Sequence, residues 1–559
     1  MAGKEGSNGG GMLRGNYPPK PISDGSYPLH PFLIAAASVL ALLTHNLNHT
    51  SIVQAAPTIA GALLFALIIY LSVAAARRRF DMRAAVIASI WVAGCLFYAG
   101  LFDTVNRWIG GGYPMVRSLT VTVPILVVLT VAATRLPHPL IRTVHLMLTG
   151  IAVMLLITPA WQTAAYEWRN REARKVYNAD QVAAELSQIA NISAVSAPGD
   201  HSPDIYHFVF DRYASAEILA RHYDFDDSAT EQFLESHGFH VVRSANSNYH
   251  RTALSLASTF HMDYLDLLAD DTRVAGYNWR PTHAMLGDHR VARFLKARDY
   301  RFVQFGSWWT GTFHNPVADV NRPHGFSEFN MLYLRYTMLR PIFHALPRTR
   351  MTMRLDWDAA QCQRVARQIK EIKALRDRKS NRDYPLYVFA HILVPHDPYS
   401  FATDGRCLSE AESNARGDRQ GYVDQVGYAG HMIQDLVTRL LADDRTPPII
   451  MIQADEGPFP DRDHNLPWHE SPADVLRIKT GILSAYYFPG HDYSQLNESI
   501  TPINSYRAVF NTYFGTGFPM LPDRVFVSAD DTRLYEFHDV TDMVRNDGHT
   551  APQPTLPPD

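Results

Sequence analysis

Three groups of acidic, basic and histidine residues lie at the ends of apolar runs in this sequence. Asp211-Arg212-Tyr213 follows residues 205–210, His391 to Tyr399 includes the end of a second run, and Asp455-Glu456-Gly457-Pro458 follows a third. One carboxylate after an apolar run is most often a loop or capping residue. Two such places together supply Asp211, Asp455 and Glu456, and oxygen-rich sets of this kind bind hard divalent cations.

A hydroxyl group that could act beside such a cation is found in the segment Asn248 to Ser258. Thr252 opens a run of small and apolar residues that predicts the start of a helix. The free N–H groups and the positive dipole end of a helix start favour a bound phosphate. A threonine that only caps the helix is the structural alternative.

The polar groups need a sheet to bring them together. Short apolar runs alternate with helical patterns after residue 203, which predicts an α/β domain with a largely parallel central sheet. Ligands bind such sheets at the carboxyl ends of the strands. The expected strands are Asp204–Phe210, Leu386–Ile392, Pro448–Gln453 and Ile482–Phe488, and the expected helices are Asp227–His237, Trp357–Leu375, Tyr422–Leu441 and Asn504–Tyr513.

Charge is distributed unevenly along the 559 residues. Residues 1–166 carry 11 Lys and Arg against 4 Asp and Glu, whereas residues 167–559 carry 41 against 51. Only 10 charged side chains fall within residues 31–166. The near-zero total of −3 argues against a strongly basic nucleic-acid binder and a highly charged disordered protein. A membrane block followed by an acidic soluble domain is therefore expected.

The charge-free stretches are long enough for membrane-spanning helices, which need about 20 apolar residues. They predict five spans near residues 31–45, 57–76, 84–102, 118–134 and 143–161. Basic loops stay in the cytoplasm. Arginines 77, 78, 79 and 83, then 135 and 142, therefore predict that the chain after residue 161 is extracytoplasmic. The cytoplasmic (inner) membrane is the expected location.

The expected organisation has five parts. They are a polar cytoplasmic tail (1–30), a five-span bundle (31–161), a connector helix and linker (162–203), a catalytic domain (204–525) and a C-terminal extension with a disordered end (526–559). Cys362 and Cys407 both fall in the exported part and either pair as one disulfide or remain two free thiols.

The motifs together resemble the sulfatase-like branch of the alkaline phosphatase superfamily. The resemblance is carried by the Asp after the first strand, Asn-Tyr-x-x-Thr-x-x-Ser-Leu-Ala-Ser, Phe-x-His-x-x-x-Pro-His-x-Pro-Tyr, and Asp-x-Gly-Pro after a late strand. Five spans before an exported domain are further similar to lipoteichoic acid synthases and lipid A phosphoethanolamine transferases.

This resemblance implies a role for each matching residue. Asp211, Thr252 and Asp455 would hold one divalent metal ion, and Thr252 would be the nucleophile. His391 and His396 would lie near the phosphoryl group or the leaving oxygen. Further substrate-binding or proton-donating positions are expected at Arg212, Asn248, His464 and His469.

Two positions depart from the family pattern. Glu456 stands where the family has a metal-binding histidine, so an all-oxygen site favouring Mn²⁺ or Mg²⁺ over Zn²⁺ is expected, or else a weakened one. Thr252 stands where true sulfatases carry a modified Cys or Ser, which disfavours sulfate-ester hydrolysis.

The resemblance implies a membrane-bound phosphotransferase that works through a phospho-threonine intermediate. It would move a phosphoglycerol- or phosphoethanolamine-type group from a phospholipid donor to an extracytoplasmic envelope glycan or lipid acceptor. A metal-dependent phosphodiesterase or other sulfatase-like hydrolase using the same nucleophile is one alternative. A non-catalytic membrane scaffold with a degenerate site is the other, and Glu456 is the feature that favours it.

Overall fold

The structure is a computed structural model that describes residues 27–111, 115–171, 202–269, 276–346, 357–377, 383–443 and 446–545. It divides into two compact units, residues 1–41 with 59–160, and residues 42–58 with 161–559. Most of the expected tail (1–26), most of the expected connector (172–201) and the last residues (546–559) lie outside the described part of the chain.

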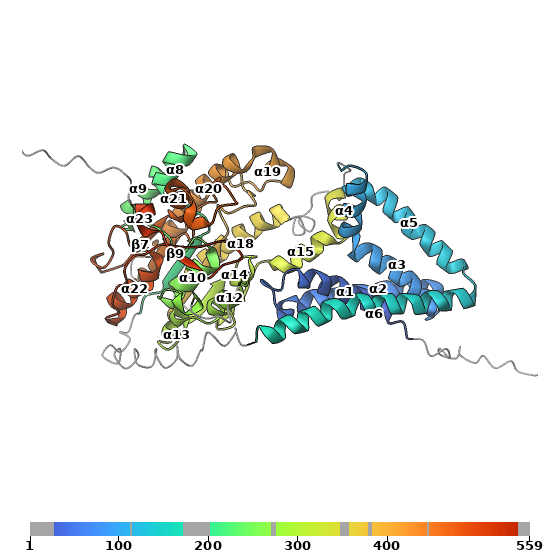
Figure 1. The fold of residues 1–559 in the computed structure, drawn as a ribbon. Coiled ribbons are helices and arrows are strands. Elements are labelled where there is room, and N and C mark those ends of the chain that lie inside the picture. The colour runs from blue at the N-terminus through green and yellow to red at the C-terminus, as the bar shows by residue number, and fades with distance from the viewer. Residues whose placement is uncertain are drawn as a thin grey trace, which may run out of the picture. The chain divides into compact units, whose positions relative to one another are not determined.

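Six helices make up the N-terminal part of the chain (Figure 1). They are α1 (His30–Thr44), α2 (Ile52–Arg77), α3 (Met82–Leu96), α4 (Tyr98–Trp108), α5 (Met115–Arg135) and α6 (His138–Arg169). Helices α2, α5 and α6 are each long and apolar enough to cross a membrane, and α3 with α4 qualifies as a fourth, broken span bent by 65°. Helix α1 is apolar but has 15 residues. The described helices thus give three to four spans, and the count of five remains a prediction.

Three of the expected spans fall in helices whose limits differ from those of the spans. Helix α2 begins at Ile52 rather than near residue 57, and α6 extends from His138 to Arg169 rather than over 143–161. The expected span 84–102 is broken at Phe97.

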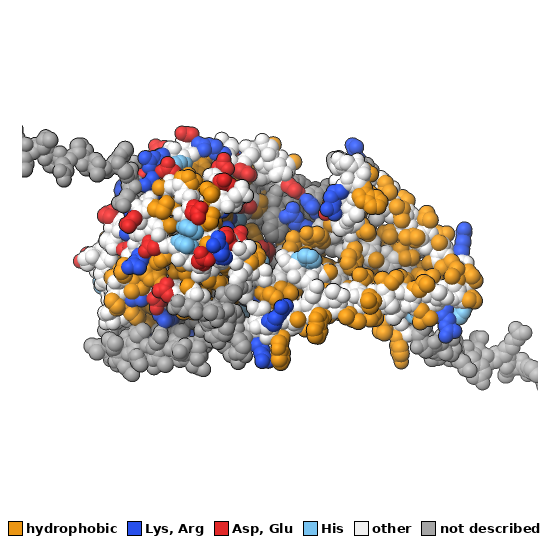
Figure 2. Space-filling model, in the orientation of Figure 1, with side chains coloured by type: hydrophobic (Ala, Val, Ile, Leu, Met, Phe, Trp, Pro, Cys, Tyr) orange, Lys and Arg blue, Asp and Glu red, His pale blue; other side chains and the backbone are white. Residues whose placement is uncertain are grey.

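The first unit carries its large aliphatic side chains on the outside. Figure 2 shows hydrophobic side chains covering α5 and α6, and exposed examples include Ile125, Val128 and Met154. Its interior uses alanines and a few polar contacts. The His30 ring contacts the Ser89 hydroxyl at 2.5 Å and the His145 ring at 3.0 Å, which joins α1, α3 and α6. Polar contacts of this kind hold helices together where lipid removes the hydrophobic driving force.

The second unit is built on a seven-stranded sheet with the order β2-β7-β6-β1-β5-β3-β4. Strand β1 is central and runs parallel to β5 and β6, and β3 and β4 continue the parallel part. Strand β7 is antiparallel to both of its neighbours, β6 and β2. A separate pair joins β8 and β9. The strands are β1 (Ile205–Phe210), β2 (His240–Val241), β3 (Arg301–Phe305), β4 (Val320–Asn321), β5 (Leu386–Ile392), β6 (Ile449–Gln453), β7 (Ser484–Tyr487), β8 (Phe526–Ser528) and β9 (Phe537–Asp539).

The sheet forms where the sequence predicts it. Every residue of β1, β5 and β6 is buried, as expected of apolar runs covered on both faces. The four expected strands and the largely parallel sheet are confirmed. Asp204 precedes β1, and its carboxylate accepts a hydrogen bond from the backbone N–H of Leu386, the first residue of β5.

The expected helices also form, with ends shifted by a few residues. The helices of the second unit are α8 (Ala216–Tyr223), α9 (Ser228–Ser236), α10 (Thr252–His261), α11 (Asp266–Ala269), α12 (Arg280–Gly287), α13 (Arg290–Lys296), α14 (Thr310–Phe313), α15 (Glu328–Tyr336), α16 (Leu339–Ala345), α18 (Trp357–Asp377), α19 (Glu410–Arg416), α20 (Asp418–Leu440), α21 (Ala473–Thr480), α22 (Ser505–Phe514) and α23 (Thr541–Arg545). Two 3₁₀ turns span Trp468–Glu470 and Pro502–Asn504.

Two further features tie this unit together. Cys362 of α18 and Cys407 form a disulfide, which resolves the alternatives left open by the sequence. The expected C-terminal extension is part of the fold as far as α23, because Phe526 of β8 stacks on Tyr249 and Val544 of α23 packs in a buried cluster with Trp468.

Candidate active site

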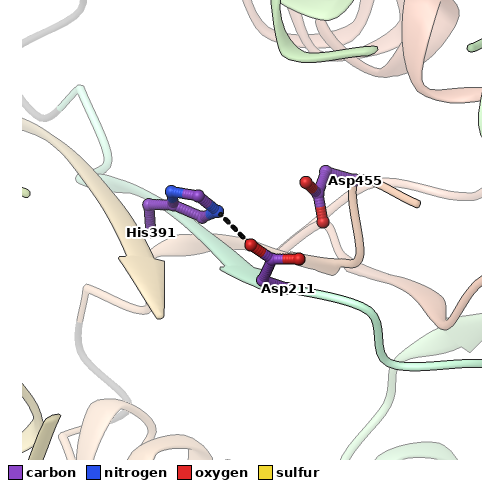
Figure 3. A group of neighbouring side chains, drawn as sticks. All are labelled: Asp211, His391 and Asp455. Atoms are coloured by element: carbon purple, nitrogen blue, oxygen red, sulfur yellow. Dashed lines mark ion pairs between the residues drawn. The ribbon is translucent and has the colours of Figure 1, made fainter. Parts of the chain in front are cut away.

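Asp211, His391 and Asp455 meet at the carboxyl ends of three neighbouring strands (Figure 3). Asp211 follows β1, His391 is the second-last residue of β5, and Asp455 follows β6 by two residues. One ligand atom from each lies within 4.8 Å of the others, and His391 Nε2 is 3.3 Å from Asp211 Oδ2. Parallel pairing of β1 with β5 and β6 therefore brings together residues far apart in the sequence.

The three side chains are buried but incompletely bonded. Each is at most 2% exposed. Asp211 Oδ1 and both carboxylate oxygens of Asp455 have no hydrogen-bond partner within the described residues. Buried carboxylates without partners are costly, and a bound cation removes that cost. This donor set of two carboxylates and an imidazole fits a divalent metal ion.

The two aspartates differ in their electrostatic surroundings. Burial raises the pKa of Asp211, but the charges of His396, His391 and Arg212 outweigh it and hold that pKa below its usual value. Burial raises the pKa of Asp455, and the nearby charges of Asp211 and Glu456 raise it further. A positive charge is therefore needed on the Asp455 side to keep both groups ionised together.

Thr252 lies beside this cluster at the start of α10. Arg251 precedes the helix, and Thr252 is its first residue, so the N–H groups of this turn have no partners within the helix. The Thr252 hydroxyl is close enough to Asp455 to lower the pKa of its carboxyl. The helix-start geometry expected from the sequence is confirmed, with Arg251 rather than Thr252 at the capping position.

A cavity of about 220 Å³ opens onto the hydroxyl. Its charged lining consists of Asp211, Arg212, Arg251, Glu456 and Asp531. Aromatic side chains form much of the rest, namely His49, Tyr277, Trp279, His283, Trp308, Trp309, His396 and Phe459. The site thus combines a carboxylate cluster, a helix start and two arginines, which suits a phosphate ester bearing a larger organic group.

The carboxylate of Glu456 pairs with two basic side chains beside the cluster. Its Oε1 is 2.8 Å from Lys479 Nζ and 3.3 Å from Arg212 Nε. Lys479 is completely buried, and burial lowers its pKa to about 8. Its ammonium group also donates to the Gly457 carbonyl and lies 3.7 Å from the Phe459 ring centre. The sequence-based expectation made Glu456 a metal ligand; in the structure its Oε1 belongs to this ion pair.

Arg212 and Arg251 place positive charge along the cavity wall. Arg212 also pairs with Asp397 at 2.5 Å, and its guanidinium lies over the Phe459 ring. Arg251 pairs with Asp531 at 2.5 Å, and its Nε has no hydrogen-bond partner within the described residues. Arg212 was expected here as a substrate-binding residue, and Arg251 was not.

The two expected histidines of the third segment occupy different positions. His391 is fixed by the Thr312 hydroxyl, 2.8 Å from Nδ1, so that Nε2 faces Asp211. His396 lines the cavity and its Nδ1 contacts the Asp397 carbonyl. His391 thus belongs to the carboxylate cluster, and His396 lies on the cavity wall, where it can contact a bound substrate.

Three other expected residues do not line this cavity. Asn248 is buried, and its side chain bonds Thr501, the Arg524 carbonyl and the Ile503 N–H, so it fixes the segment before Thr252. His469 stacks on His538 with ring centres 3.6 Å apart. His464 is exposed.

Several functional residues were not expected from the sequence. They are His49, Thr312, Lys479 and Asp531. His49 belongs to the polar interruption between the first two apolar runs, which was the one available signal. The others carry no motif, because their proximity to the site depends on tertiary packing.

The structure is similar to several solved proteins. It aligns with the C-terminal periplasmic domain of EcEptC from Escherichia coli, solved in complex with zinc, at 12% identity and a TM-score of 0.40, covering 62% of this chain and 95% of that one. The lipoteichoic acid synthase LtaP from Listeria monocytogenes aligns at 12% identity and a TM-score of 0.36, covering 62% and 84%.

A membrane protein is also among these structures. It is the lipooligosaccharide phosphoethanolamine transferase A (EptA) from Neisseria meningitidis, at 12% identity and a TM-score of 0.35, covering 86% of this chain and 93% of that one. No family model and no curated protein matches the sequence. Likeness at this level does not establish an activity, which has to be inferred from the site itself.

Proposed function

We propose that this protein is a membrane-anchored phosphotransferase whose nucleophile is the Thr252 hydroxyl. The observation that carries the proposal is the position of Thr252, at a helix start and beside buried carboxylates that lack partners. A threonine hydroxyl reacts only when a neighbouring group activates it. The arginine-lined cavity in front of it suits the phosphodiester of a phospholipid.

Asp211, His391, Asp455 and Thr252 would hold the divalent metal ion. When bound, such an ion lowers the pKa of a coordinated hydroxyl and offsets charge on phosphoryl oxygens. One imidazole in this set removes the expected preference against Zn²⁺, because imidazole nitrogen suits Zn²⁺ as well as Mn²⁺. Metal analysis of the purified full chain decides between them.

The transfer proceeds in two steps. The Thr252 hydroxyl gives its proton to the Asp455 carboxylate as its oxygen forms a bond to phosphorus, and the bond from phosphorus to the diacylglycerol oxygen breaks. His396 supplies the proton with which diacylglycerol leaves, while Arg212 and Arg251 hold the phosphoryl oxygens. An acceptor hydroxyl then attacks phosphorus and gives its proton to His396, the bond from phosphorus to the Thr252 oxygen breaks, and Thr252 regains its proton from Asp455.

An extracytoplasmic site in the inner membrane is consistent with two observations. The Cys362–Cys407 disulfide is typical of oxidising compartments. The arginines at the ends of α2 and α5 support a cytoplasmic position for those ends, because basic loops stay in the cytoplasm. The acceptor would then be an envelope glycan or lipid.

Intact-mass measurement tests the proposal. The full chain in detergent is incubated with Mn²⁺ and phosphatidylethanolamine or phosphatidylglycerol. We expect an added phosphoethanolamine or phosphoglycerol mass on Thr252, retained in Thr252→Ser and absent in Thr252→Ala. Diacylglycerol release without an adduct or acceptor would instead indicate a hydrolase. A folded, metal-bound chain with neither product would refute the proposal.

A further inference from the structure

The active-site cavity includes a residue from the segment that joins α1 to α2. His49 lies in residues 42–58, which belong to the same compact unit as Thr252. It lines the same cavity as Thr252, about 200 residues away in sequence. The mechanism described above gives His49 no role.

His49 is held in place by a defined set of contacts. Its Nε2 is 2.7 Å from the Tyr277 hydroxyl, and its ring stacks on Trp279 with centres 6.2 Å apart. The preceding carbonyl, that of Asn48, accepts a hydrogen bond of 3.0 Å from the Trp279 N–H. The segment is therefore docked onto residues 277–279.

The last turn of α6 strengthens this docking. Tyr166 donates to the Asn48 side chain at 3.0 Å, and Glu167 pairs with Arg280 at 3.1 Å in a largely buried position. Residues 161–169 of α6 belong to the same unit. Two helices that are long and apolar enough to span a membrane thus end at this wall of the cavity.

The wall presents polar side chains to the cavity. Trp279 lines the cavity beside Tyr277 and is only 8% exposed. Beside it, His49 and Tyr277 complete a wall suited to hydroxyl or ester oxygens.

The position of His49 in the chain indicates where that group comes from. His49 precedes Ile52, the first residue of α2, by three residues, a distance of at most about 11 Å. The head-group layer on each side of a bilayer is roughly 5–8 Å thick. A cavity lined by His49 therefore lies within reach of lipid head groups that remain in the membrane.

We propose that His49, with Trp279, binds the head group of a membrane phospholipid in the active-site cavity. This inference rests on the proposed function and specifies which part of the chain holds the donor. The connection between the first two apolar helices then becomes part of the site, and the extracytoplasmic domain without residues 42–58 lacks one wall.

Binding measured without turnover gives the first test. In a Thr252→Ala background of the full chain, glycerophosphoethanolamine and inorganic phosphate are titrated by calorimetry. We expect His49→Ala to weaken binding of the glycerophosphodiester about tenfold, the size of one lost hydrogen bond, and to leave phosphate binding unchanged. His45→Ala is the matched control, because His45 lies in the same segment but is exposed.

Turnover gives the second test. Vesicles of equal parts phosphatidylethanolamine and phosphatidylglycerol are compared with bis(4-nitrophenyl) phosphate, a diester without a lipid head group. We expect His49→Ala to raise KM for the vesicle substrate about tenfold at unchanged kcat, with little effect on the small diester. Melting curves show that the variant is folded, and His49→Gln is expected to recover part of the loss.

Two results would overturn the inference. One is equal binding by His49→Ala and His45→Ala. The other is a loss in His49→Ala that is the same for both diesters, which would indicate a general structural role. If the protein turns over neither diester, the proposed function fails, and the binding measurement alone decides the role of His49.

Discussion

The buried carboxylates at the site differ in the charges that surround them. Asp211 and Asp455 have oxygens without partners and face His391. Glu456, the residue directly after Asp455, pairs with the buried Lys479 and with Arg212. Adjacent residues in sequence therefore belong to different electrostatic groups.

Asp211 and Asp455 therefore need a bound cation to balance their charge, whereas basic side chains of the protein balance the charge of Glu456. Lys479 and Arg212 supply two positive charges beside Glu456, so the protein itself balances the charge of this carboxylate, although its Oε2 has no hydrogen-bond partner within the described residues. Asp211 and Asp455 repel each other until a cation is bound. The comparison also argues against a degenerate site, because the departure at Glu456 is matched by a buried lysine while the other carboxylates remain available.

Removing the internal cation is expected to have the largest effect on stability. Lys479→Met leaves Glu456 buried with only Arg212, and breaking a buried pair costs about 3–5 kcal/mol. Melting of the full chain measures the loss. Lys296→Met is the control, because Lys296 pairs with Asp319 at the partly exposed surface and should cost at most about 1 kcal/mol. The double variant Lys479→Met, Glu456→Gln should recover much of the loss; no recovery would show that the pair is not the cause.

Adding a cation is expected to stabilise the unpaired set. At 100 times its Kd, Mn²⁺ should stabilise the native chain by about 2.7 kcal/mol. Asp455→Asn should remove this effect and should melt higher than the native chain without metal, since the repulsion with Asp211 is lost. Asp461→Asn, at an exposed position, serves as the control. Equal Mn²⁺ stabilisation in both variants would contradict the assignment.

A fourth buried carboxylate, that of Asp227, has neutral partners instead of charged ones. Asp227 accepts hydrogen bonds from Tyr213 at 2.9 Å and Thr230 at 2.7 Å, and burial raises its pKa to about 6. The pKa of Asp227 is higher in the folded chain than in the unfolded chain, so its protonated form stabilises the fold at low pH. The free energy of unfolding should therefore fall by about 2 kcal/mol as pH rises from 4 to 7.

The pH dependence of melting checks this value. Asp227→Asn cannot ionise, so its melting temperature relative to the native chain should rise over the same pH interval. Asp226→Asn changes the neighbouring residue and should follow the native curve. A constant difference between native chain and Asp227→Asn would show that Asp227 does not titrate in this range.

The smallest effect is expected for metal affinity in Glu456→Gln. Because Oε1 of Glu456 is engaged by Lys479, this change should alter the Kd for Mn²⁺ by about twofold or less, although it destabilises the fold. Calorimetric titration measures it. A loss of affinity for Mn²⁺ of tenfold or more would show that Glu456 is a metal ligand, as the sequence suggested, and that it acts together with Asp211 and Asp455.

The sequence predicts the strands of the sheet better than it predicts the side-chain contacts around the site. Largely apolar runs identify β1, β5 and β6, and the polar residues at the end of each run can be read directly from the sequence. Strand β3 was missed because Arg301 and Gln304 interrupt its apolar character. Its neighbour β4 has only two residues.

Side-chain partners are less accessible to such reasoning. Lys479 lies beside Glu456 because α21 leads into β7, which pairs with β6, and the sequence offers no periodicity that links positions 23 residues apart. Thr312 likewise reaches His391 only through tertiary packing. The disulfide was one of two open alternatives for the same reason.

The contacts of His30 with Ser89 and His145 have a consequence for biosynthesis. They join α1 to α6, which are the first and last described helices of the N-terminal part of the chain. While the intervening helices are being made, His30 has no access to His145. The bundle can therefore close only after residue 145 has been inserted. Until then, the His30 ring lacks the contact with His145 that it has in the folded unit.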